Sequence, residues 1–448
     1  MHKLYLNVFV VFQNKKFFKS FFKNLDMLEM RFIRENRDFV KECIKQRDQQ
    51  EKLELVDKVI AYNEELSLIR KEVDELRHKR NVLNAEIIQL KKQNKDISEK
   101  LKLSKQIVKE LEKKEERLRF LEHEIKNILY KVPNILLPDV PIGKDEADNK
   151  VLRTWGKPKL EKPELPHGEI LERLGVADFK RAAKVSGAGF VYLQKELALL
   201  DLSLQFFAIE FLIKKGYTLV EPPFMIRKLA YQGVIDLKDF EDVLYKIADE
   251  DLYAIATAEH PLVAKHMNEV LNKEDLPIKY VGFSPCFRKE IGSHGVDTKG
   301  LFRMHQFNKV EQVIFCLPED SESLHEELLK NAEEMLQKLE IPYRVVAICS
   351  GDISNVAAKQ YDIEAWFPRE QTYKEVTSCS NCLTYQATRL GIKYKNNDKK
   401  EYVHTLNGTG IATSRTMRAI VENYYNKDGT ISVPKVLQKY FGIKKIGG

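Results

Sequence analysis

Residues 283–313 read FSPCFRKEIGSHGVDTKGLFRMHQFNKVEQV, and this stretch decides how the rest of the chain is interpreted. Two apolar runs flank a segment rich in glycine and polar residues, a pattern typical of two strands joined by a long loop. The hairpin places Arg288 and Arg303 at the ends of facing strands. Guanidinium groups bind phosphate and carboxylate through paired hydrogen bonds, so the two arginines suit an anionic ligand. Taken alone, an arginine in such a hairpin is more often an ordinary surface residue.

Around the hairpin, β-type runs and helical patterns alternate irregularly. Strands are expected at 217–220, 280–283, 312–315 and 343–348, and helices at 191–214 and 323–339. This order favours an α+β domain built on a largely antiparallel β-sheet flanked by helices, rather than a doubly wound sheet. No GxxxxGK[ST] string is present, and the glycine string at 408–413 lacks the third glycine of a dinucleotide-binding loop.

The region before this body carries a heptad repeat. Apolar residues recur at alternating spacings of four and three from Leu55 to Leu90, and again from Leu103 to Ile128. The polar run KKQNKD at 91–96 separates the two segments. Two heptad segments of similar length joined by a short polar turn predict an antiparallel coiled-coil helical arm. A coiled coil that joins two subunits is the alternative for such a repeat.

Positive charge gathers around the turn of this hairpin. Seven lysines lie between positions 91 and 109, against two acids, Asp96 and Glu99. A basic surplus at the tip and on the returning helix suits contact with a phosphate backbone. An ordinary solvated charged face is the alternative.

Length and overall charge set wider limits. A chain of 448 residues with 43% hydrophobic residues has room for two domains and a large core. The formal charge is +7, but residues 1–25 hold five lysines and no acid, so global charge says little about partners. We expect three parts: an N-terminal extension of unclear role at 1–26, the helical arm at 27–132, and a catalytic domain at 133–448.

The extension and the cysteines bear on the compartment. Residues 4–12 are apolar, but no small-residue cleavage site follows, so the extension is interpreted as dispensable or as a start site placed too early, rather than as a targeting peptide. No apolar run approaches the ~20 residues that span a bilayer, so no membrane association is expected. Six scattered cysteines do not form a disulfide framework, which favours the reducing cytoplasm. Cys379 and Cys382 would supply half of a zinc site, but no zinc is expected because no second pair of ligands accompanies them.

The stretch 283–313 resembles motif 2 of the class II aminoacyl-tRNA synthetases, and in its details that of the seryl-tRNA synthetases. The likeness runs from residue 27 almost to the C-terminus. It includes the string after the arm (PNILLPDVPIGKDEADN, 133–149), a motif 1-like string (GYTLVEPPFMI, 216–226) and the loop AIATAEHPL (254–262). It also includes the segment YKEVTSCSNCLTYQATR (373–389) and a motif 3-like string, LNGTGIATSRTMRAIVEN (406–423). The order and spacing of these strings together are very specific.

The resemblance implies ATP-dependent activation of L-serine to seryl-adenylate and transfer of serine to the 3′ end of serine tRNA, with AMP and pyrophosphate released. The resemblance leaves open whether selenocysteine tRNA is also charged. The helical arm would bind the tRNA across a homodimer held by the motif 1 region. Activation requires positioning and charge neutralisation rather than a general base, because the serine carboxylate is already ionised.

The resemblance also assigns residues. Arg288 and Arg415 would be catalytic, holding the α- and γ-phosphates, and Phe307 would stack on adenine while Glu290 contacts the base. Glu375 and Ser378 would hold Mg²⁺ bridging the phosphates. The full set expected to bind ATP is Arg288, Lys289, Glu290, Arg303, Met304, Phe307, Glu375, Val376, Thr377, Ser378 and Arg415. The set expected to bind serine is Thr257, Ala258, Glu259, Arg288, Glu311, Asn407 and Thr409.

The chain departs from the family pattern at three positions. Ser414 stands where glycine commonly precedes the motif 3 arginine, and Thr384 and Thr388 replace an acid and an arginine. These changes put contacts at 384 and 388 in doubt. Two rival functions are a ligase that passes serine to a carrier protein and a non-enzymatic homologue. The first is expected to lack the long arm, and the second to have lost one of the motif residues; neither loss is seen here.

Overall fold

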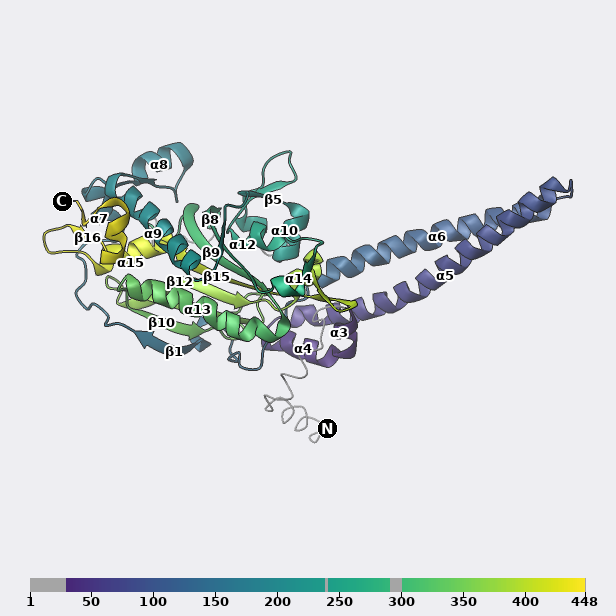
Figure 1. Ribbon diagram of the computed structural model, residues 1–448, viewed down its shortest axis with the longest axis horizontal. Coiled ribbons are helices and arrows are strands. Elements are labelled where there is room, and N and C mark those ends of the chain that lie inside the picture. The colour runs from purple at the N-terminus through teal and green to yellow at the C-terminus, as the bar shows by residue number, and fades with distance from the viewer. Residues whose placement is uncertain (1–29, 238–240, 291–299, 448) are drawn as a thin grey trace, which may run out of the picture. The chain divides into compact units, whose positions relative to one another are not determined.

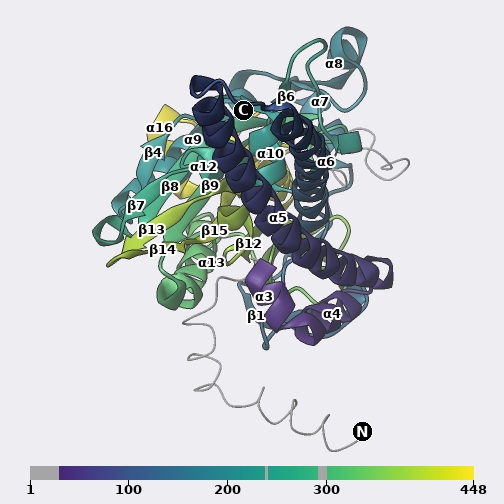
Figure 2. The same cartoon turned by 90° about the vertical axis from the view of Figure 1, so that its right-hand side faces the viewer.

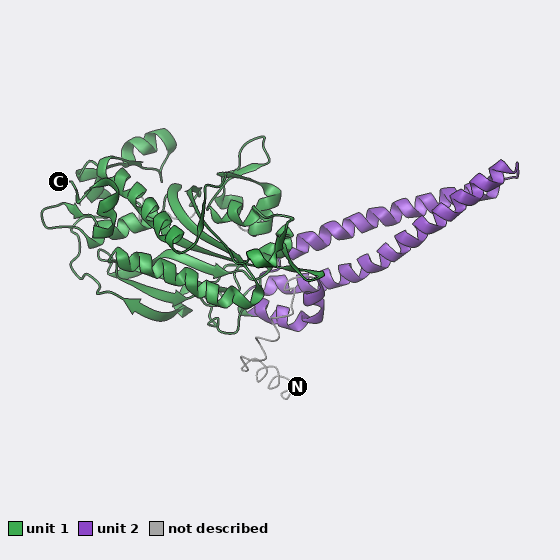
Figure 3. Ribbon diagram, in the orientation of Figure 1, with its two compact units in different colours: residues 1–27, 46–48, 134–448 green, residues 28–45, 49–133 purple. Residues whose placement is uncertain are grey.

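The computed structural model describes residues 30–237, 241–290 and 300–447, which fall into two compact units (Figure 3). One unit comprises residues 28–45 and 49–133, and the other comprises residues 46–48 and 134–448. The extension expected at 1–26 lies outside the described residues. The three domain boundaries drawn from the sequence stay a prediction.

The first unit is helical. It contains α3 (Met30–Glu35), α4 (Arg37–Gln46), the short 3₁₀ helix η1 (Gln50–Lys52), α5 (Leu53–Lys92) and α6 (Ser98–Leu129). Helices α5 and α6 run side by side (Figures 1 and 2), and at 1.5 Å per residue α5 alone is about 60 Å long. The heptad positions form the buried seam, which is made by Val59, Leu66, Ile69, Val73, Leu76 and Leu83 of α5 and by Ile107, Leu111, Leu121, Ile125 and Ile128 of α6.

Ion pairs across the seam fix the register of the hairpin. Arg117 on α6 donates to both oxygens of Glu65 on α5 at 2.7 Å, and Lys114 contacts Glu72 at 2.6 Å. The predicted antiparallel hairpin of two helices within one chain is therefore confirmed. Its heptads are satisfied intramolecularly, since each helix buries its apolar stripe against the other.

The second unit is built on an eight-stranded sheet. Its strand order is β1-β10-β11-β12-β15-β9-β8-β4, and every neighbouring pair is antiparallel except β4 with β8. The bounds are β1 Lys150–Trp155, β4 Thr218–Val220, β8 Ile278–Phe287, β9 Gln306–Cys316, β10 Tyr343–Ala347, β11 Lys359–Phe367, β12 Thr372–Asn381 and β15 His404–Ala412. The predicted α+β class with a largely antiparallel sheet is confirmed.

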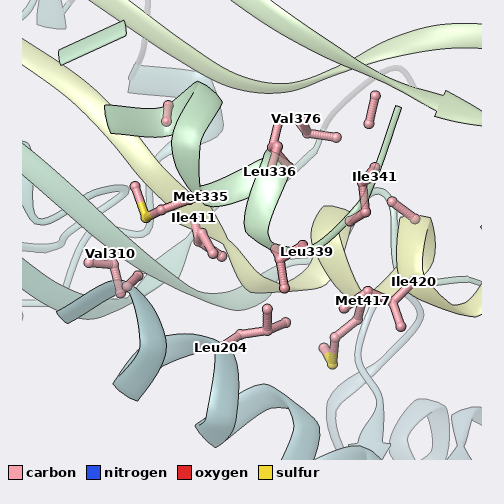
Figure 4. Close-up of a cluster of buried hydrophobic side chains, with 14 of the residues drawn as sticks. Leu204, Val310, Met335, Leu336, Leu339, Ile341, Val376, Ile411, Met417 and Ile420 are labelled. Carbon is pink, nitrogen blue, oxygen red and sulfur yellow. The ribbon is translucent and has the colours of Figure 1, made fainter. Parts of the chain in front are cut away.

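Three helices cover one face of this sheet: α9 (Lys195–Lys214), α13 (Ser321–Lys338) and α15 (Thr413–Asn423). Figure 4 shows the core between them and the strands, to which Leu204 of α9, Met335 of α13 and Met417 of α15 contribute together with Val310 and Ile411. The predicted helix at 191–214 begins four residues later, because Tyr192 and Leu193 form strand β3 and pair with β2.

Smaller helices cover part of the opposite face. Helices α10 (Lys228–Val234), α12 (Glu259–Ala264) and α14 (Tyr385–Leu390) bury a second core around Tyr231, Leu262, Val313, Phe315 and Leu390. The remaining elements are α7 His167–Arg173, α8 Phe179–Ser186, α16 Gln438–Phe441, β2 Ala177–Asp178, β3 Tyr192–Leu193, β5 Met225–Arg227, β6 Leu252–Ala254, β7 Val270–Asn272, β13 Lys393–Asn396, β14 Lys399–Tyr402, β16 Ile431–Ser432, β17 Lys445–Ile446 and five 3₁₀ turns, η2 to η6. Within the described ranges, no helix is long and apolar enough to cross a membrane.

Candidate active site

Strand alternation collects the candidate residues on one face of the sheet. Side chains two apart on a strand share a face, so Phe307, Lys309 and Glu311 of β9 point away from the core that Val310 and Ile314 enter. The stretch of β15 that pairs with β9 carries Thr409 directly opposite Glu311. Polar groups therefore stand together on the face opposite α9, α13 and α15.

The Glu311 carboxylate is the centre of the predicted serine-binding set. It is buried, and its Oε2 atom accepts hydrogen bonds from the hydroxyls of Thr257 at 3.4 Å and Thr409 at 3.3 Å. Lys309 Nζ lies 2.5 Å from the same oxygen. Two hydroxyls from separate elements thus converge on one carboxylate, as a pocket for a small polar molecule requires.

Glu259 adds a second carboxyl to this pocket. It stands at the start of α12, where its backbone N–H donates to the Thr257 hydroxyl at 3.2 Å. Its Oε1 accepts from the Gln386 amide at 3.1 Å. Burial, and next the negative charge of Glu311, raise the pKa of Glu259 to about 7, while the charges of Lys309 and Arg288 oppose that rise. Ala258, between the two polar residues, is buried in the second core.

Arg288 stands directly after β8, where the hairpin leaves the sheet. Its Nε donates to the Ala256 carbonyl at 3.3 Å, and its guanidinium carbon lies 5.3 Å from the centre of the Phe307 ring. The hairpin therefore holds a cation above an aromatic ring on the same face as Glu311. Arg303, the second arginine of the motif, is exposed in the loop before β9.

Other predicted nucleotide-binding residues border this position. Lys289 is held by a backbone hydrogen bond to Val243 at 2.9 Å, and Glu290, which follows it, has a φ angle of 46°. Met304 and Phe307 line a cavity of about 110 Å³ whose other walls include Ser414. The cavity shows that space exists beside these two residues.

A β-bulge brings Glu375 and Ser378 to one face. Residues three apart on a regular strand point to opposite faces. Here the pairing with β11 shifts, so that Glu375 lies opposite Glu364 while Ser378 lies opposite Asp362. Because those two partners are two positions apart on β11, Glu375 and Ser378 share a face. Val376 instead buries its side chain in the main core, and Thr377 is also buried.

Arg415 joins this group from the first turn of α15. Its guanidinium contacts the Glu375 carboxylate at 3.0 Å and the Glu375 carbonyl at 3.1 Å. Asn407 of β15 lies on the same face as Thr409 and donates to the Cys382 sulfur at 3.5 Å. The predicted residues thus form two neighbouring sets on one sheet face, an acidic and hydroxyl-bearing set around Glu311 and a set around Arg415 and Glu375.

Cys379 and Cys382 are both unpaired and buried, and burial raises the pKa of each thiol. The Cys379 side chain enters the main core beneath β12, whereas the Cys382 sulfur meets Asn407. Among the residues that the structure describes, no group of three or more His, Cys, Asp or Glu side chains is placed to hold a metal ion.

Sequence reasoning missed four neighbours of the site. Lys309 and Gln386 bond directly to the two pocket carboxyls. Asp362 lies beside Glu375, and burial followed by the Glu375 charge raises its pKa well above the usual range. His305 bonds to the Tyr245 hydroxyl. The alternation of Phe307, Lys309 and Glu311 along one strand is the signal that could have identified Lys309.

Comparison with known proteins identifies relatives of both units. The family described as "Seryl-tRNA synthetase N-terminal domain" matches residues 27–136, and "tRNA synthetase class II core domain (G, H, P, S and T)" matches residues 244–424. The serine–tRNA ligase of Methanocella arvoryzae is 49% identical over 92% of this chain and 98% of its own.

Two solved structures extend the comparison. The seryl-tRNA synthetase of Pyrococcus horikoshii, complexed with ATP, has a TM-score of 0.86 at 48% identity and covers 94% of this chain and 99% of its own. The cytoplasmic serine–tRNA ligase of Naegleria fowleri, in complex with AMP, has a TM-score of 0.82 at 36% identity and covers 94% and 98%.

Proposed function

The chain belongs to the seryl-tRNA synthetase family, and from that premise we propose how its residues divide the work of the reaction. The enzyme uses ATP to activate serine and transfers the serine to tRNA. In the first step the serine carboxylate attacks the α-phosphorus of ATP and pyrophosphate leaves. In the second, a hydroxyl at the 3′ end of the tRNA attacks the seryl carbonyl and AMP leaves.

Serine is bound by the set around Glu311. The ammonium group of serine pairs with Glu311, and the hydroxyl is held by Thr257, Glu259 and Thr409, with Asn407 closing the pocket. The observation that carries this assignment is the convergence of the Thr257 and Thr409 hydroxyls on one buried carboxylate oxygen. A site built to hydrogen-bond a hydroxyl rejects alanine strongly, because alanine leaves its buried polar groups unpaired.

ATP is bound at the end of the hairpin. Adenine stacks on Phe307 and meets Glu290, while Met304 and Lys289 line the base. Arg288 holds the α-phosphate and neutralises the charge that develops there in the transition state. Arg415 holds the γ-phosphate, and Arg303 reaches the phosphates from the loop. Val376 takes part through its backbone, because its side chain lies in the core.

Mg²⁺ fits the donors around β12. The bulge places the Glu375 carboxylate and the Ser378 hydroxyl on one face, and oxygen donors of this kind suit a hard cation. Mg²⁺ commonly takes one or two protein ligands and completes its shell with phosphate oxygens and water, so a cage of three or more side chains is unnecessary. When bound, the ion neutralises charge on the phosphates of ATP.

The helical arm binds the tRNA. Lys91, Lys92 and Lys95 stand at its tip, and within the described residues no acidic side chain lies within ion-pair distance of any of them. Lys100, by contrast, pairs with Glu86. Unpaired lysines at an exposed turn are placed to contact phosphates, and the coiled-coil seam is already filled within one chain.

The enzyme is a homodimer joined through α9 and β4. Helix α9 exposes Leu202, Phe206 and Ile213, which recur at helical spacing on one side, and strand β4 exposes Leu219 at the end of the sheet. An apolar stripe next to an open strand edge suits a second copy of the chain. We also place the enzyme in the cytoplasm. All six of its cysteines are thiols rather than disulfides, and a reducing compartment keeps thiols in that state.

Exchange of labelled pyrophosphate into ATP tests the assignment of serine. We expect exchange that depends on serine, and we expect Glu311→Gln to abolish most of it. Glu327→Gln is the matched control, because Glu327 also pairs with a lysine (Lys279, at 2.7 Å) but does so on the opposite face of the sheet. Exchange driven better by threonine or alanine than by serine would overturn the assignment.

A further inference from the structure

A buried lysine stands inside the serine pocket without an assigned task. Lys309 leaves 8% of its side chain exposed and Glu311 only 2%, and their charged atoms are 2.5 Å apart. Lys309 Nζ also lies 3.4 Å from the Thr409 hydroxyl. A lysine is expensive to bury, so an ammonium group at this depth must be balanced by its surroundings.

The charges of the pocket balance only when Lys309 is counted. The charges of Glu259 and Glu311 act on one another, and both residues bond to the Thr257 hydroxyl; Arg288 is the other cation that acts on Glu259. With both cations present the ionised pocket is neutral, which matches a serine zwitterion. Without Lys309 two buried carboxylates would share one cation, and close carboxylates in that situation retain a proton between them.

We propose that Lys309 is a positioning residue that favours the ionised form of both pocket carboxylates, and so prepares the pocket for an ammonium group near neutral pH. The inference rests on the proposed serine site. An ammonium ligand forms an ion pair with a carboxylate. When the carboxyl group is protonated, the ammonium has no negative charge to pair with and binds more weakly. Loss of Lys309 would therefore make serine binding wait for the release of a proton.

The titratable and charged groups that face Glu259 come from several elements. They are Glu311 and Lys309 on β9, Arg288 after β8, Tyr231 on α10 and Cys382 before α14. Burial raises the pKa of the Tyr231 hydroxyl and of the Cys382 thiol, so neither becomes charged near neutrality. Glu259 is the pocket member that gains or loses charge there.

The test is the pH dependence of kcat/KM for serine in pyrophosphate exchange, compared among the unaltered chain, Lys309→Met, Lys309→Gln and Lys309→Arg. In the unaltered chain kcat/KM should level off near pH 7. In Lys309→Met and Lys309→Gln the inflection should move to higher pH, with kcat/KM falling about tenfold for each pH unit below it. Lys309→Arg, which keeps the charge, should restore the original profile, and KM for ATP should change little in all three.

Lys279→Met is the matched control. This substitution also removes a lysine that pairs with a glutamate, but the pair lies on the side of the sheet that α13 covers. Its profile should equal that of the unaltered chain. Lys309→Gln, a polar replacement, covers the case in which Lys309→Met does not fold. An unshifted profile in Lys309→Gln, with serine-dependent exchange intact in the unaltered chain, overturns this inference and leaves the serine assignment standing. A shift that Lys309→Arg fails to reverse overturns it as well.

Discussion

Replacing Arg288 by alanine should slow adenylate formation far more than it weakens substrate binding. Within the described residues, the Arg288 side chain donates one long hydrogen bond, to the Ala256 carbonyl at 3.3 Å, and lies over the Phe307 ring at 5.3 Å. The contact of the guanidinium with the Phe307 ring is worth about 0.5–1 kcal/mol at a partly exposed site. Arg288→Ala should therefore lower the free energy of unfolding by only about 1 kcal/mol. The larger effect lies in the transition state, because charge builds on the α-phosphate only there.

Loss of one preorganised donor to a developing charge costs about 2–4 kcal/mol, which corresponds to a fall in kcat of roughly 30- to 1000-fold. The measurement is pyrophosphate exchange at saturating serine and ATP, with kcat and both KM values determined separately. KM for ATP should rise only a few-fold. Arg288→Lys should recover part of the rate, because lysine keeps the charge but loses the planar fork.

Arg153→Ala serves as the control. Arg153 pairs with Glu333 and joins the edge strand β1 to α13, so its removal tests the cost of losing a buried arginine contact away from the site. Exchange by this variant should match that of the unaltered chain. A kcat for Arg288→Ala within about threefold of normal, or a loss confined to KM, would refute the role assigned to Arg288.

Three further outcomes follow from other parts of the molecule. Glu375→Gln should raise the Mg²⁺ concentration that gives half-maximal exchange by at least about tenfold, and an unchanged Mg²⁺ dependence would remove Glu375 from the ion. Replacing the three tip lysines, Lys91, Lys92 and Lys95, by alanine should weaken tRNA binding, while pyrophosphate exchange stays normal. The salt dependence of tRNA binding should also flatten, by roughly one counterion per lost phosphate contact. Folding raises the pKa of Glu259 from 4.5 to about 7, so between these pH values Glu259 holds a proton in the folded chain that it releases in the unfolded chain. The contribution of this group to stability is therefore greatest below about pH 4.5 and is lost as the pH rises through 7, so Glu259→Gln should flatten the pH dependence of Tm across that window, and an unaltered slope would contradict the assignment.

The hairpin could be predicted from the sequence because its signals are local. Apolar runs on either side of residues 291–299 define two strands, and strand alternation then places Phe307 and Glu311 on one face. The heptads of the arm are local in the same sense. Each of these patterns lies within a few tens of residues of sequence. The fold class and the sheet face that carries the site could therefore be predicted from them.

Other features depend on pairing between distant segments. The bulge at Val376 brings Glu375 and Ser378 to the same face of the sheet. It depends on how β12 pairs with β11, and the sequence of β12 alone does not predict it. Gln386 reaches Glu259 across 127 positions because α14 and α12 cover the same end of the sheet. Asp201 is an intermediate case. It is a buried acid in the apolar helix α9, and its Oδ2 accepts from the Asn308 amide at 2.7 Å next to Phe307. The sequence shows the anomaly but not its partner.

A crystal structure with a non-hydrolysable seryl-adenylate analogue will show whether one face of the sheet binds both serine and ATP. We expect the serine ammonium within hydrogen-bond distance of the Glu311 carboxylate, the phosphate mimic against Arg288, and adenine on the Phe307 ring. An analogue bound elsewhere, or bound here with its ammonium turned away from Glu311, would refute the assignment of this face.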